Sequence, residues 1–108
     1  MTRETTSTTR ETATAAADVV VVLDGDTDAG HRLARTLLAD GRRVAVIGHH
    51  AASVVRSMHG YPAERVLAIA GDVGDQRNWA RIVERVTERF GRIDRVVRAE
   101  DAALRASA

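Results

Sequence analysis

Three aspartates, Asp24, Asp26 and Asp28, stand at alternate positions directly after an apolar run of valines. Alternating carboxylates are typical of divalent-ion loops, so a metal site formed by these three residues is one hypothesis. The loop departs from an EF-hand, because Ala29 stands where that loop needs glycine and Arg35 stands where it needs a bidentate glutamate. The residue types therefore leave a divalent-ion site open as one interpretation.

The same loop leads into a predicted helix, and the N-terminus of a helix attracts anions. Its free amides and about half a positive charge favour a phosphate. A carboxylate placed about 4 Å from that phosphate would cost about 4 kcal/mol at an effective dielectric constant of about 20. We therefore expect only weak dinucleotide binding at this turn. We expect Asp28 to serve as the N-cap instead, accepting a hydrogen bond from the amide of Gly30 or His31.

The length of 108 residues fits one small domain. Residues 1–17 are rich in threonine and repeat the tetrapeptide TRET, a composition that predicts a disordered tail. The remaining residues 18–108 form the predicted domain. Because the chain has one Phe, one Trp and one Tyr, its core must consist of Val, Leu, Ile and Ala.

Composition excludes several classes of function. Basic and acidic residues are balanced at sixteen and fifteen, so we expect no nucleic-acid partner. No apolar run is long enough to span a membrane and no secretory signal is present, so we expect a cytoplasmic protein. The chain contains neither cysteine nor lysine, which removes thiolate catalysis, a phosphate-binding lysine and a Schiff base.

Short apolar runs alternate with amphipathic stripes along the predicted domain. The apolar runs, each predicted to be a strand, lie at 19–23, 44–47, 66–70 and 93–97. The stripes, each predicted to be a helix, lie at 30–41, 51–58 and 79–90. This alternation predicts an α/β fold of the Rossmann-like three-layer αβα type. Its parallel sheet has about four strands in the order 3-2-1-4.

Three segments resemble the N-terminal half of short-chain dehydrogenases/reductases. LARTLLADGRRVAVIG at 33–48 is similar to the first helix and second strand of that family. RVLAIAGDVGD at 65–75 is similar to its third strand and adenine-contacting turn, and WARIVERVTERFGRIDRVV at 79–97 to its next helix and strand. The resemblance implies an NAD(P)-binding Rossmann domain of an oxidoreductase.

The motifs that carry the family's chemistry do not match. With Leu33 anchored, the three glycine positions of the family's first turn fall on Asp24, Asp28 and Gly30, and sliding by one residue recovers Gly25 but breaks the spacing to Gly30. The Asn-Asn-Ala-Gly positions fall on residues 98–101, where the sequence reads Arg-Ala-Glu-Asp. The family's catalytic Ser and Tyr-x-x-x-Lys have no counterpart, and we assign no catalytic residue.

If a cofactor binds, the resemblance favours NADP(H) over NAD(H), because Gly48 and His49 end the second strand without an acidic residue. The positions assigned to such a cofactor are Gly25, Gly30, His31, His49, Asp72 and Val73. The competing interpretation makes the histidines exposed residues at helix ends and Asp72 an ordinary turn residue.

The residues and the resemblance together predict a degenerate Rossmann domain that acts by binding or assembly rather than by catalysis. The alternatives are a residual NADP(H)-binding half-domain that contributes to an oxidoreductase complex, and a divalent-ion site on the aspartate loop. The fourth strand would be an open, valine-rich edge, so we expect self-association or a protein partner there.

Overall fold

The structure is a computed structural model and describes residues 18–99. Predictions for residues 1–17 and 100–108 lie outside the described residues. The elements, in chain order, are β1 (Val19–Leu23), α2 (Asp28–Ala39), β2 (Arg43–Gly48), α3 (Ala51–Val55), the 3-10 helix η1 (Arg56–Met58), β3 (Val66–Ala70), α4 (Gln76–Phe90) and β4 (Arg95–Arg98).

The four strands form one parallel sheet in the order β3-β2-β1-β4, as the sequence predicts. Five consecutive buried residues make β1 hydrophobic on both faces, which suits a central strand of a parallel sheet. Because all strands run the same way, their carboxyl ends meet at one edge. That edge collects the loops that follow β1, β2 and β3, together with the end of β4.

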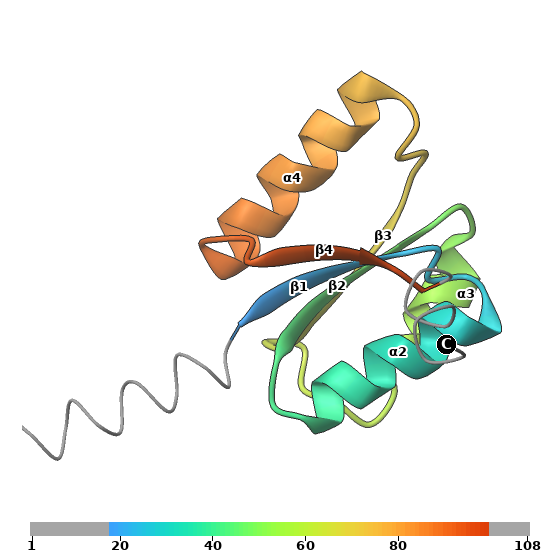
Figure 1. Cartoon of the computed structure of the whole chain (residues 1–108), viewed down its shortest axis with the longest axis vertical. Helices are drawn as coiled ribbons and strands as arrows, with labels where there is room; N and C mark the ends of the chain where they lie inside the picture. Colours follow the sequence, from blue (N-terminus) through green and yellow to red (C-terminus); the bar gives the residue numbers. More distant parts are fainter. Residues whose placement is uncertain (1–17, 100–108) are drawn as a thin grey trace, which may run out of the picture.

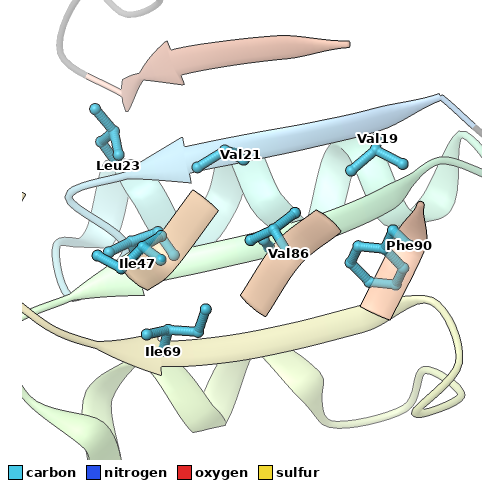
Figure 2. Close-up of a cluster of buried hydrophobic side chains, with 9 residues drawn as sticks. Val19, Val21, Leu23, Ile47, Ile69, Val86 and Phe90 are labelled. Carbon is cyan, nitrogen blue, oxygen red and sulfur yellow. The ribbon is translucent and has the colours of Figure 1, made fainter. Parts of the chain in front are cut away.

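Helices cover both faces of the sheet. Figure 1 shows α4 on one face, and α2 and α3 on the other. Alternate residues of the strands divide accordingly into two cores. The α4 core joins Val19, Val21 and Leu23 of β1 to Ile82, Val86 and Phe90, as Figure 2 shows in part. The second core joins the remaining valines of β1 to α2 and α3.

Helix α4 has well-defined ends. The side chain of Asp75 accepts hydrogen bonds from the backbone amides of Arg77 and Asn78, at 2.8 and 3.2 Å, and so caps the N-terminus. Gly91 ends the helix with a φ of 86°, a left-handed conformation that glycine adopts without steric cost. The predicted amphipathic stripe and the glycine stop are both confirmed.

The fourth strand begins later than the apolar run suggests. Ile93 packs against the α4 core and precedes the strand. Asp94 makes two hydrogen bonds with Val19 at the start of the sheet. Its carboxylate accepts one from the Val19 amide at 2.8 Å, and its own amide donates one to the Val19 carbonyl at 2.9 Å. The strand then runs from Arg95 to Arg98. Among residues 18–99, no helix is long and apolar enough to cross a membrane.

Candidate functional site at the carboxyl edge of the sheet

The sequence-predicted site residues gather at the carboxyl edge of the sheet. Since β1 lies between β2 and β4, the chain crosses over in opposite directions from β1, and the point between β1 and β4 is the topological switch point. Ligands of open α/β folds bind outside the carboxyl ends of the strands at such a point. The loop that follows β1 and the end of β4 therefore form the candidate site.

The loop after β1 turns back on itself within four residues. Asp24 has a φ of 58°, and it is the one non-glycine residue with a left-handed backbone among residues 18–99. The Asp24 carbonyl accepts hydrogen bonds from the amide and the hydroxyl of Thr27, at 3.1 and 2.7 Å. Aspartate and asparagine tolerate this backbone conformation better than most residues. The strained residue is thus one of the three carboxylates.

The prediction that Asp28 caps α2 is wrong. The N-cap is Thr27, whose hydroxyl oxygen accepts a hydrogen bond from the Gly30 amide at 3.0 Å, while Asp28 is the first helical residue. Threonine takes the cap because the turn from Asp24 brings its hydroxyl between the Asp24 carbonyl and the helix amides. Asp28 still places a negative charge in the first turn, where that charge interacts favourably with the positive end of the helix dipole.

The three carboxylates of the loop have three different partners. Asp24 lies 3.3 Å from the guanidinium of Arg98 at the end of β4. Asp28 lies 3.2 Å from the guanidinium of Arg56 in η1. Asp26 accepts a hydrogen bond from a backbone amide on β2's side of the edge. The carboxylates therefore diverge rather than converge on a common point.

This divergence bears on the metal hypothesis. Across the described part of the chain, no group of three or more His, Cys, Asp or Glu side chains is arranged to hold a metal ion. Asp24, Asp26 and Asp28 therefore do not form such a group, although their alternate spacing suggested one. The backbone of Asp24 is left-handed at the start of this loop, with a φ of 58°.

Asp26 closes the loop onto the end of β2. Its carboxylate accepts a hydrogen bond from the His49 amide at 3.0 Å. It also lies against Gly48, where a Cβ atom would come within 3.0 Å of the Asp26 carboxyl carbon and 2.6 Å of a Val54 methyl group. Gly48 is therefore required for the loop to pack. The sequence does not predict this contact, because nothing in the spacing of residues 26 and 49 indicates that they meet.

Two glycines that the resemblance assigns to the cofactor turn have a demonstrable steric role. A Cβ atom at Gly25 would come within 2.2 Å of the Val46 side chain, and one at Gly30 within 2.1 Å of the Asp24 carbonyl oxygen. The Gly25 amide also donates to the Ile47 carbonyl at 2.7 Å. These glycines thus let the loop approach β2 and α2 closely, and contacts within the protein are sufficient to explain both.

The other predicted cofactor residues lie along the same edge. His49 is exposed just beyond β2. Asp72, also exposed, turns its carboxylate back to its own loop and accepts a hydrogen bond from the Gly74 amide at 2.9 Å. Val73 packs partly against the α4 core. Asp72 thus behaves as a turn residue in this structure.

His31 does not lie exposed at a helix end. It is half-buried, and its Nδ1 lies 2.9 Å from the hydroxyl of Ser57, which is completely buried. Burial lowers the pKa of His31, and the nearby Arg56 and Arg35 lower it further, while Asp28 opposes them. The imidazole therefore links α2 to η1, and its predicted place among the cofactor residues gains no support from this contact.

Tyr61 and Arg65, whose spacing imitates a Tyr-x-x-x-Lys pair, lie in the loop that precedes β3. The Arg65 guanidinium donates to the Leu38 carbonyl and lies 6.0 Å from the centre of the Tyr61 ring. Arg35 lies over the same ring at 5.1 Å. The tyrosine is thus enclosed by two arginines near the C-terminal end of α2, away from the carboxyl edge of the sheet.

Comparison with known proteins identifies the family. A family model described as short chain dehydrogenase matches residues 18–100. The chain belongs to the short-chain dehydrogenase family. This is a family of NAD(P)-binding oxidoreductases, and the match covers every strand and helix described above. No curated protein matches the chain in sequence.

Solved structures of the family share the fold. A short-chain dehydrogenase from Streptomyces avermitilis is 26% identical, with a TM-score of 0.67 over 74% of this chain and 29% of that chain. One from Bacillus anthracis is 24% identical, with a TM-score of 0.69 over 75% of this chain and 34% of that chain. A 3-ketoacyl-(acyl-carrier-protein) reductase from Brucella melitensis, complexed with NADH, is 20% identical, with a TM-score of 0.68 over 73% of this chain and 32% of that one. The chain spans about a third of the length of these structures.

The residues at the switch point do not fit a pyrophosphate in this conformation. A dinucleotide would bring two negative phosphates to an edge that already holds the carboxylates of Asp24 and Asp26. Arg98, the cation at the end of β4, is engaged by Asp24. Because Arg98 offsets the charge of Asp24, Asp26 is the carboxylate that would repel a phosphate, at a cost of about 4 kcal/mol for a separation of about 4 Å and an effective dielectric constant of about 20.

Proposed function

We propose that this member of the short-chain dehydrogenase family acts by binding or assembly and carries out no hydride transfer by itself. The proposal is supported above all by the ion pair between Asp24 and Arg98, which joins the ends of β1 and β4 across the switch point. In the proposed role, this pair keeps the nucleotide edge closed, and the protein acts through its surface.

The proposed assembly surface is the free edge of β4. Within residues 18–99, β4 pairs with β1 alone. Its side chains are largely exposed, and Val96 has 45% of its surface open to solvent. An exposed strand edge with an apolar side chain is a template for pairing with another chain. A second copy of this chain or another protein would cover it.

A residual NADP(H) site that contributes to an oxidoreductase complex is the second candidate. It is supported by the family and by the end of β2, where His49 is exposed and Gly48 carries no acidic side chain. Asp26 weighs against it, because its carboxylate adds a negative charge beside His49, where a 2′-phosphate would bind. A divalent-ion site is the third candidate, and the divergence of the three carboxylates weighs against that.

Calorimetric titration with NADPH, run in chelator, tests the proposed closure. The unmodified protein should give no binding heat up to about millimolar NADPH, which corresponds to an affinity of about −4 kcal/mol. Asp24→Asn removes one negative charge and releases Arg98 while keeping a residue that tolerates a left-handed backbone. This variant should bind NADPH at least about tenfold more tightly than the unmodified protein.

Asp40→Asn is the matched control. Asp40 caps the far end of α2 and pairs with Arg42 at 3.2 Å, so this change removes the same charge at a distance from the switch point. It should leave NADPH binding unchanged. Micromolar binding by the unmodified protein would overturn the proposed closure and favour the NADP(H)-binding candidate.

A further inference from the structure

Four arginines form a ladder along α4. Arg77, Arg81, Arg85 and Arg89 follow one another at intervals of four residues, and all four are exposed. Side chains four residues apart are neighbours on a helix surface, and each step advances about 6 Å along the axis. The ladder therefore presents a row of guanidinium groups over about 18 Å of the exposed surface of α4.

Three of these arginines have no partner in the described part of the chain. The ion pairs among residues 18–99 involve other arginines, and the guanidinium groups of Arg77, Arg81 and Arg85 make no hydrogen bond there. Arg89 donates to the Ala63 carbonyl. Like charges four residues apart destabilise a helix slightly.

A hollow adjoins the ladder where α4 passes the edge strand β3. Its volume is about 310 Å³, and its lining consists of Leu67, Arg85, Glu88 and Arg89. Leu67 supplies an apolar wall that packs partly against the α4 core. The hollow lies beside β3, whereas the proposed assembly edge is β4 at the opposite side of the sheet.

We propose that the ladder and the hollow together dock an acidic helical segment of a partner protein. Carboxylates at intervals of four residues on that segment would face Arg77, Arg81 and Arg85, and one apolar side chain would enter the hollow against Leu67. This inference does not rest on the proposed closure of the nucleotide edge, since none of these residues lies there.

The surface fits an acidic protein better than a nucleic acid. Glu84 and Glu88 are exposed on the same helix between the arginines. A nucleic-acid strand carries a phosphate about every 3.4 Å along its axis, so some phosphates would lie beside these carboxylates. A protein helix can place its own carboxylates beside the arginines alone. It can also offer an apolar side chain to the hollow.

A synthetic helical peptide with glutamate at every fourth position and a single leucine is the probe. Its affinity would be measured by fluorescence anisotropy at low ionic strength, because exposed ion pairs are screened by salt. Arg81→Glu combined with Arg85→Glu should weaken binding at least about tenfold, and Arg81→Gln with Arg85→Gln should weaken it less. A peptide with alanine in place of its leucine should also bind more weakly.

Arg32→Glu is the matched control. Arg32 is exposed on α2, on the other face of the sheet, and its side chain has no partner among residues 18–99. This variant should bind the peptide like the unmodified protein. Three results would each overturn the proposal: no binding by the unmodified protein below about millimolar peptide, an equal loss in Arg32→Glu, or equally tight binding of a DNA duplex.

Discussion

At the residue scale, the distinctive feature of this protein is how it neutralises its own carboxylates. Asp24 and Asp28 each lie beside an arginine from a distant element, and Asp26 accepts a backbone amide. Both ion pairs are substantially exposed, so each contributes at most about 1 kcal/mol to stability. Their importance lies in the arginines that they engage, Arg98 at the switch point above all, rather than in the energy that they supply.

His31 gives a pH-dependent prediction at the same scale. The folded protein lowers the pKa of His31 below 6.5, so around that pH the unfolded chain binds more protons than the folded one. The stabilisation is fully present above about pH 6.5 and is lost as the pH falls toward the lowered value. We expect the free energy of unfolding in urea to be smaller at about pH 5 than at about pH 8.

His31→Gln should remove most of that pH dependence. His59→Gln is the control, because His59 is exposed, and it should retain the dependence shown by the unmodified protein. The pKa of Asp94 is also lowered, first by the hydrogen bond from the Val19 amide. This shift changes the free energy of unfolding at more acidic pH, so it does not affect the comparison between about pH 5 and about pH 8. An unchanged pH profile in His31→Gln would contradict the assignment.

At the element scale, α2 is fixed at its start by Thr27 and tied to η1 through two contacts. Thr27→Ala should lower the free energy of unfolding by about 1 kcal/mol, since it leaves the Gly30 amide without its cap. Asp28→Ala removes only a favourable charge and an exposed ion pair, and should cost about 0.5 kcal/mol. Chemical denaturation of the two variants measures the difference. A larger loss for Asp28→Ala would show that the aspartate is the cap.

At the scale of the whole molecule, the sheet has two unequal edges. Beside β3, Arg85 and Arg89 of α4 line the hollow with Leu67, whereas β4 exposes Val96 and carries Arg95 and Arg98 at its ends. Charged residues at an edge limit uncontrolled pairing but do not cover the backbone between them. The β4 edge is therefore the surface for which we predict self-association or a protein partner.

Sedimentation velocity over a range of concentrations tests that prediction. The unmodified chain should show an average mass that rises with concentration, and Val96→Lys should stay monomeric because lysine blocks an edge. Val55→Lys is the matched control, since Val55 on α3 is 44% exposed, almost as much as Val96. This control should associate like the unmodified chain. A monomer at high concentration of the unmodified protein would defeat the prediction of self-association.

The strand order and the family follow from the sequence alone. The periodicity of apolar residues is set by local geometry, so β1, α4 and Gly91 could be predicted from their neighbours in the chain. Parallel strands with right-handed crossovers then leave few topologies, and the order β3-β2-β1-β4 is among them. The segments between residues 33 and 97 that resemble a known family then identified that family.

The partners of the polar side chains were decided only by the tertiary structure. Asp24 meets Arg98 and Asp26 meets the amide of His49 because parallel strands bring their carboxyl ends to one edge. His31 reaches Ser57 because α2 packs beside η1. These contacts join residues 23 to 74 positions apart, and their direction depends on single backbone dihedrals such as the left-handed φ of Asp24. Periodicity carries no information on either, so the sequence predicted a site at this edge but not the partners of its side chains.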